Sequence, residues 1–211
     1  MESSFKNMVL VLTGITCLSG AILGGVNMIT TAPIQEAKLA KQLNAIKMVA
    51  PAYDNDPLAE KQVITLADGT QATIYPAKMG GQEVGAAVEA ITKKGFSGTI
   101  NVMVGFKKDG SINEYTVLSH AETPGLGSKM QEWFHTKSSV LGLTPGTSAF
   151  KLSKEGGKVD AITAATISSR AFLDAVTNAY NAYKDQADAS SGATPPSKFE
   201  HLYNEKEEKQ S

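Results

Sequence analysis

The chain has 211 residues, of which 20 are basic and 21 acidic, so its formal net charge is −1. This length suits one domain with a short additional segment and excludes a large multidomain enzyme. The balanced charge offers no basic surface for a phosphate backbone, so no nucleic acid is expected as a partner, and the single cysteine, Cys17, can form neither an internal disulfide nor a cysteine-rich metal site.

The N-terminal residues predict a membrane helix. Residues 8–29 are 22 positions without a charge, and a helix of that length reaches about 33 Å, enough to cross a bilayer. A cleaved signal sequence is the alternative, but its apolar core is typically only about 7–15 residues long. Cys17 follows Gly14-Ile15-Thr16, which is not a lipoprotein sequence. We therefore predict a retained, single-pass anchor over residues 1–32, and its glycines suit close packing against a neighbouring helix.

The next segments predict a helix and then a sheet. Apolar residues recur at helical spacing over residues 34–49, which indicates a juxtamembrane amphipathic helix within a linker of residues 33–60. Alternating, β-branched stretches predict strands at residues 62–66, 70–75, 83–92, 98–106 and 112–119. Asp68-Gly69 and Asp109-Gly110 are typical hairpin turns.

Two helices follow the predicted strands. The first begins near Ser128 and carries Met130, Trp133, Phe134 and Val140. The second carries one apolar stripe: Ile167, Ala171, Phe172, Ala175, Val176, Ala179, Tyr180 and Tyr183. Residues 61–185 are thus expected to form an α+β domain with a mainly antiparallel sheet flanked by helices. Residues 186–211 have few apolar side chains to offset the entropy of ordering, which predicts a flexible tail.

The start of the last helix is a candidate phosphate site. Thr163 is expected to be the N-cap, with Thr166 at the third helical position. The free amides of the first turn and the helix dipole favour a phosphate there. From this pattern alone an ordinary capped helix without a ligand is the favoured interpretation, because threonine is common at helix starts.

Three stretches resemble a known family. Asp160-x-x-Thr163-Ala164-Ala165-Thr166 resembles the Asp-x-x-(Ser/Thr)-Gly-Ala-Thr signature of proteins that carry FMN on the final threonine. Residues 95–100, Gly-Phe-Ser-Gly-Thr-Ile, and residues 120–127, His-Ala-Glu-Thr-Pro-Gly-Leu-Gly, resemble the same FMN-binding domain. With the membrane helix, residues 5–185 resemble the family of the G subunit of the Rnf ion-translocating ferredoxin:NAD oxidoreductases, which is related to the C subunit of the sodium-pumping quinone reductase.

The resemblance implies a cofactor site without catalytic residues of its own. FMN would be attached to Thr166 through a phosphodiester, and the isoalloxazine or the phosphate would be lined by residues of two segments. Those residues are Ile162, Thr163, Ala164 and Ala165 from the first, and Glu122, Thr123, Pro124, Gly125, Leu126, Gly127 and Lys129 from the second. His120, His135 and His201 have no metal-ligand spacing, so no metal site is expected.

The resemblance also implies a place in the cell. The protein would be an electron-carrying subunit, inactive alone, among the other Rnf subunits and beside the flavin-bearing D subunit in the bacterial inner membrane. A flavin transferase would install the FMN, and membrane lipid would surround the anchor. The domain would face the periplasm or exterior, although a count of Lys and Arg alone favours the cytoplasm. A non-redox envelope binding module and a free-standing flavin reductase are the alternatives.

Two features depart from the family pattern. Ala164 occupies the signature's glycine position, so we expect an ordinary helical backbone there rather than one that only glycine adopts cheaply. Residues 188–194, Asp-Ala-Ser-Ser-Gly-Ala-Thr, match the signature letter for letter. Thr166 is the favoured attachment point, because a helix follows it, whereas Thr194 precedes Pro195 and Pro196, which have no amide donors. Flavin on both threonines remains an open alternative.

Overall fold

The computed structural model describes residues 5–66 and 68–190. The chain divides into two units, Met1–Asn44 and Ala45–Ser211, and each is considered by itself. The first consists of most of helix α1, and the second contains the sheet and the remaining helices.

Helix α1 runs without interruption over Phe5–Val49 and has Pro33 in its interior. The helix predicted over residues 34–49 is confirmed, and it continues directly from the apolar helix, because α1 passes through Pro33 without a break. Proline removes one amide donor but does not end every helix, since the bonds on either side of it can persist. Over Asn7–Val49 this helix is long and apolar enough to cross a membrane, with a mean hydropathy of 2.1 in its most apolar section. None of that section is buried within the protein.

The second unit is built on a five-stranded antiparallel sheet whose strands follow one another in chain order. The strands are β1 (Gln62–Thr65), β2 (Gln71–Met79), β3 (Gln82–Thr92), β4 (Ile100–Lys107) and β5 (Ile112–Ser119). The predicted α+β class with an antiparallel sheet is confirmed, and each predicted strand overlaps an observed one.

Tight turns join most of these strands. At the first Asp-Gly pair, Gly69 has a φ of 78°, and Asp68 Oδ1 accepts the Thr70 amide at 2.9 Å and the Thr70 hydroxyl at 2.6 Å. Asp109 makes the same two contacts with Ser111, beside Gly110 at a φ of 79°. Both Asp-Gly turns were predicted. The turn at Gly80 and Gly81 between β2 and β3 was not predicted, although both glycines have the positive φ that a two-residue hairpin turn requires.

The helix predicted near Ser128 is broken into three short turns. A 3-10 turn (Gly127–Lys129) leads into α2 (Met130–Glu132) and then a π-helical turn (Trp133–Lys137). The Tyr115 hydroxyl donates to the carbonyl oxygens of Met130 and Gln131, both at 2.9 Å. Burial raises the pKa of that hydroxyl, and the neighbouring Glu114 raises it further, so Tyr115 remains a donor to this segment.

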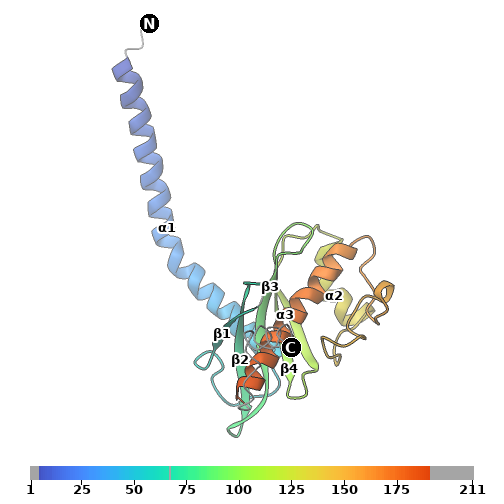
Figure 1. The fold of residues 1–211 in the computed structure, drawn as a ribbon. Coiled ribbons are helices and arrows are strands. Elements are labelled where there is room, and N and C mark those ends of the chain that lie inside the picture. Colours follow the sequence, from blue (N-terminus) through green and yellow to red (C-terminus); the bar gives the residue numbers. More distant parts are fainter. Residues whose placement is uncertain (1–4, 67, 191–211) are drawn as a thin grey trace, which may run out of the picture. The chain divides into compact units, whose positions relative to one another are not determined.

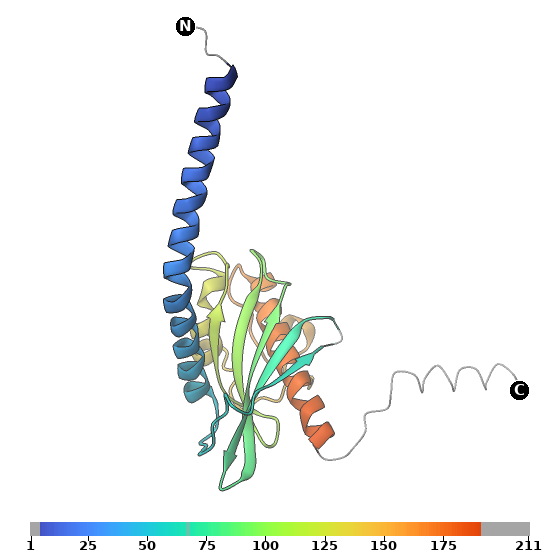
Figure 2. The same cartoon turned by 90° about the vertical axis from the view of Figure 1, so that its left-hand side faces the viewer.

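Helix α3 (Thr166–Ser190) lies along one face of the sheet (Figures 1 and 2). It packs against β3 and β4 and buries Phe172, Val176 and Ala179 against sheet residues such as Phe106. The helix continues beyond the predicted end at residue 185, because Gln186 is still buried against the domain at 7% exposure. The rest of the predicted tail, residues 191–211, lies outside the described residues.

A smaller cluster covers the opposite face of the sheet. Tyr75, Ala87, Met103 and Leu118 pack there against the last turn of α1, at Ala45, Ile46 and Val49. A core on both faces makes the sheet a rigid support, and the first turn of α3 is held in place by the packing of the turns that follow it.

Candidate functional site

The segment before α3 forms a tight turn rather than a helical cap. The Ala165 amide donates to the Ile162 carbonyl at 3.0 Å, and the helix begins at Thr166. Thr163 is therefore not the N-cap and Thr166 is not the third helical residue, so both predictions were wrong. Ser169, in the first turn of the helix, instead connects the helix to the preceding turn: its Oγ accepts the Ile162 amide and donates to the Ala165 carbonyl, both at 2.9 Å.

Ala164 has a φ of 60° and is the one non-glycine residue with a positive φ in the described part of the chain. The expectation of an ordinary helical backbone at this position was wrong. A turn whose third residue alone has positive φ is the type that favours glycine there. The signature's glycine thus matches a conformation that this chain imposes on alanine, at a cost of about 1–2 kcal/mol.

Replacing Ala164 with glycine is expected to stabilise the protein. Relief of the left-handed strain outweighs the extra entropy that glycine gives the unfolded chain, about 0.4–1 kcal/mol, so we expect a net gain of up to about 1 kcal/mol and a Tm higher by roughly 2–4 °C. Thermal melts of the detergent-solubilised chain measure this change in Tm. Ala165→Gly is the matched control, since Ala165 has no positive φ and the variant should lose about 0.4–1 kcal/mol through the added entropy of the unfolded chain. An unchanged or lower Tm for Ala164→Gly would show that the turn is not strained.

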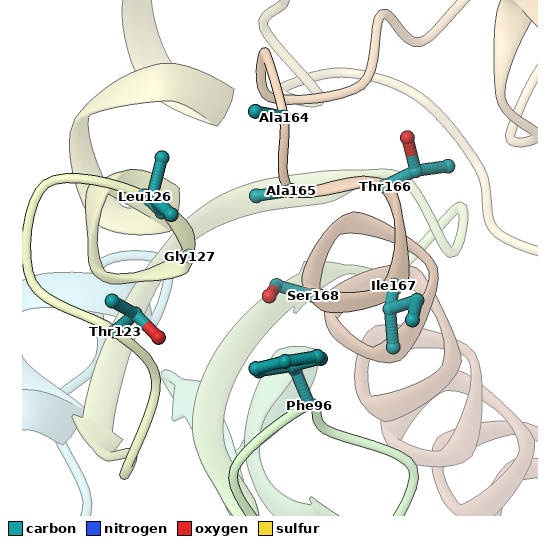
Figure 3. A pocket seen from close by; sticks show the side chains of 9 residues that line it. All are labelled: Phe96, Thr123, Leu126, Gly127, Ala164, Ala165, Thr166, Ile167 and Ser168. Carbon is teal, nitrogen blue, oxygen red and sulfur yellow. The ribbon is translucent and has the colours of Figure 1, made fainter.

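A cavity of about 350 Å³ opens beside this turn (Figure 3). Its lining comes from three parts of the chain: Phe96; Thr123, Leu126 and Gly127; and Ala164, Ala165, Thr166, Ile167 and Ser168. These are the three stretches that the sequence singled out. Phe96, Leu126 and Ile167 are 67%, 40% and 50% exposed, so the opening has an apolar rim accessible to a flat ligand.

Thr166 combines an accessible hydroxyl with a helix start. It lines the cavity, and its hydroxyl makes no hydrogen bond within residues 5–66 and 68–190. Neighbouring hydroxyls are engaged: Ser168 donates to Glu122, and Ser169 donates to the Ala165 carbonyl. The Ser169 amide donates to Ala165 O at 3.0 Å, so the amides of residues 166–168 precede the helical ladder and are available to an anion.

Glu122 lies behind the cavity wall, with only 4% of its surface exposed. One carboxylate oxygen accepts the Ser97 amide at 3.0 Å, and the other accepts the Ser168 hydroxyl. A Cβ on Gly95 would lie 2.7 Å from the first oxygen, and a Cβ on Gly127 would lie 2.8 Å from the second. Each glycine also has a nearer neighbour, the Gly98 carbonyl oxygen at 2.1 Å from a Cβ on Gly95 and Ser168 Oγ at 2.5 Å from one on Gly127, so the carboxylate is one of several groups that leave no room for a side chain there.

The residues present fit an FMN group. The apolar rim suits a planar ring system, and the start of α3 suits a phosphate. Each element of this fit comes from residues that line one cavity (Figure 3).

The structure brings only part of the predicted site together at the cavity. Thr123, Leu126, Gly127, Ala164, Ala165 and Thr166 line it. Glu122 contacts it through Ser168, and Ile162 is buried in the core at 2% exposure. The other four predicted residues do not line the cavity: Thr163, Pro124, Gly125 and Lys129.

Three lining residues were not predicted for the site: Phe96, Ile167 and Ser168. Phe96 lies inside a stretch that the resemblance had identified, so its place in the motif was the available signal. Ile167 was assigned to the buried stripe of α3, which was wrong, because the first turn borders the cavity and leaves the side chain 50% exposed. No local signal identified Ser168 as a lining residue, since its partner Glu122 is 46 residues away in the sequence.

Comparison with known proteins agrees with this site. The FMN-binding domain family matches residues 95–181, which contain every cavity-lining residue. The chain is similar to proteins named as the G subunit of an ion-translocating oxidoreductase complex. It is 32% identical to that of Vibrio atlanticus, over 85% of this chain and 90% of the relative. Identity with the Yersinia pestis protein is 35%, over 73% and 78%, and with a Vibrio cholerae protein 31%, over 85% and 90%. The chain therefore belongs to the family of the G subunits of ion-translocating oxidoreductase complexes and contains an FMN-binding domain.

Proposed function

We propose that this protein is a membrane-anchored electron carrier whose FMN is attached through a phosphodiester to Thr166. The observation that carries the proposal is the unengaged hydroxyl of Thr166 at the start of α3, on a residue that lines a cavity with an apolar rim. The bound flavin would supply the redox chemistry, and the protein would supply its position and electrostatic surroundings.

The chain's own residues have separable roles in this proposal. The first-turn amides of α3 hold the phosphate, which the helix dipole also favours. The turn at residues 162–165 sets the position of Thr166, and Ser169 holds both ends of that turn. Phe96, Leu126 and Ile167 offer apolar contact to the ring, and their exposure leaves a route for electrons to a neighbouring cofactor.

The name of the relatives supports a place in a multisubunit, ion-translocating complex. In this proposal the apolar part of α1 anchors the protein in the bacterial inner membrane, among the integral subunits and membrane lipid. The domain faces the periplasm or exterior beside the flavin-bearing D subunit, and a flavin transferase installs the FMN. The protein has no separate substrate and is inactive outside the complex.

Retention of flavin after denaturation tests the function. The protein is made in cells that contain the flavin transferase, denatured and separated on a gel, and the band is examined for flavin fluorescence. A fluorescent band, with the mass of esterified FMN on the peptide containing Thr166, is the expected result. A flavin released on denaturation would indicate a reductase with dissociable cofactor, and a protein without flavin would favour a non-redox binding module. The Thr194 peptide is expected to be mostly unmodified.

Membrane topology gives an independent prediction. Protease added to intact spheroplasts should digest the domain, because it lies outside the cytoplasm, and the intact mass of membrane-extracted protein should retain residues 8–29. Inverted vesicles are the control, in which the domain should be protected. Digestion in inverted vesicles alone would reverse the proposed orientation, and cleavage between Ser19 and Ala32 would contradict the retained anchor.

A further inference from the structure

The buried carboxylate of Glu122 accepts hydrogen bonds from Ser97 and Ser168 behind the cavity wall. We infer that the charge of Glu122, which the Ser168 hydroxyl partly offsets, lowers the reduction potential of the flavin bound in this cavity. The inference rests on the proposed attachment at Thr166 and concerns residues that the attachment itself does not need.

The first step in the argument is the position of the charge. Ser168 lines the cavity, and its hydroxyl donates to a Glu122 oxygen. The carboxylate is therefore separated from the cavity by one side chain. Both residues are nearly inaccessible, Glu122 at 4% and Ser168 at 3% exposure, so water does not screen the charge as it does at the surface.

The second step is the absence of a compensating cation. Within the described part of the chain, the ion pairs join Lys78 to Glu60, Lys94 to Asp174, His135 to Glu114 and Arg170 to Glu155. Glu122 has a neutral amide, from Ser97, and a neutral hydroxyl, from Ser168. Both contacts are hydrogen bonds from neutral groups, so neither offsets a charge on the carboxylate as a paired cation would.

The third step is the room that the chain makes for this group. Added methyl groups at Gly95 and Gly127 would approach the two oxygens within 2.7 and 2.8 Å, and the methyl group at Gly127 would also lie 2.5 Å from Ser168 Oγ. Glu122 thus joins three segments that are distant in sequence. That arrangement by itself is compatible with a purely structural role, so the test must separate charge from shape.

The electrostatic consequence has a definite sign. Adding an electron to the ring increases negative charge in the cavity, and a nearby anion opposes that addition. In a redox titration the electron comes from the mediator, which is oxidised as the flavin is reduced. Removing the charge should favour reduction, whereas removing the donor that stabilises the charge should strengthen its field and oppose reduction.

Two variants separate these effects in the full-length protein carrying its flavin. Glu122→Gln keeps the size and hydrogen-bonding capacity and removes the charge. We expect the equilibrium constant for one-electron reduction of the flavin to rise at least tenfold, which raises the reduction potential by about 59 mV. Ser168→Ala keeps the carboxylate and removes its hydroxyl donor. The equilibrium constant should then fall at least threefold, which lowers the reduction potential by about 28 mV.

A matched control removes the same charge elsewhere. Glu89 extends from β3 on the face opposite α3, where its carboxylate accepts from Asn101 Nδ2 at 2.8 Å. Glu89→Gln is expected to change the constant less than twofold. Thermal melts of each variant without flavin measure whether the substitution changes stability. Glu122→Gln should retain a Tm close to that of the flavin-free wild-type protein.

The results are interpreted by sign. Opposite shifts in Glu122→Gln and Ser168→Ala support the inference, and shifts of the same sign, or none above twofold, overturn it. If Glu122→Gln fails to fold, Ser168→Ala alone decides: a fall in the constant supports the inference, and an unchanged or raised constant contradicts it. If the wild-type protein lacks flavin, the proposed function is contradicted as well. If the flavin is present but the variants do not shift its reduction potential, this inference alone is contradicted.

Discussion

Thr166→Ala is expected to remove covalently bound flavin completely while leaving the fold intact. The substitution deletes the hydroxyl that forms the ester, and alanine at a helix start costs little because it is the better helix former. The Thr166 hydroxyl makes no hydrogen bond within residues 5–66 and 68–190, so its loss breaks no internal contact there. Fluorescence of the denatured band should disappear, and the Tm of flavin-free protein should be unchanged within about 2 °C.

Two other threonines are matched controls for Thr166→Ala. Thr163 is exposed in the same turn, and Thr123 lines the same cavity from the opposite loop. Thr163→Ala and Thr123→Ala should keep the covalent flavin, because neither hydroxyl belongs to the first turn of α3. Thr166→Ser tests whether the hydroxyl alone suffices for the transferase. Flavin that persists in Thr166→Ala and disappears in Thr194→Ala would move the attachment to residue 194 and leave the carrier function standing.

Phe172→Ala is expected to destabilise the domain by about 3–5 kcal/mol, since it leaves a cavity in the core. Phe172 is fully buried, stacked on Phe134 at a centroid distance of 4.5 Å and set edge-on to Tyr115 at 5.0 Å. A domain of this size is typically stable by only about 5–15 kcal/mol, so much of that margin would be lost. The loss also weakens the packing that holds the first turn of α3 and its Thr166 beside the cavity.

The loss of unfolding free energy in Phe172→Ala is measured by urea unfolding of the solubilised chain, monitored through the fluorescence of its single tryptophan. Trp133 donates its indole N–H to the Asp160 carbonyl at 2.9 Å, so its emission reports on the contact between the π-helical turn and the segment that precedes α3. Ile167→Ala is the control on the same helix: its side chain is 50% exposed and should change stability by no more than about 0.5 kcal/mol. A loss below about 1 kcal/mol for Phe172→Ala would contradict the packing described for α3.

Local sequence was sufficient for the elements whose physics is local. Alternation of apolar residues located all five strands, because a strand with one buried face repeats every two residues. Asp68-Gly69 and Asp109-Gly110 located two turns, because the glycines supply positive φ and each aspartate accepts the amide two residues further on. The uncharged length of residues 8–29 was enough to identify a helix that can cross a membrane.

The tertiary structure decided the details of the site. Local preference favours a right-handed Ala164, and the left-handed turn persists because Ser169 bonds to both its ends and α3 is fixed by the core. Glu122 meets Ser97 and Ser168 across sequence separations of 25 and 46 residues. The same packing turns Ile167 toward the cavity although its spacing suits the buried stripe. Such contacts depend on how the sheet and α3 pack together, and the pattern of nearby residues carries no record of that packing.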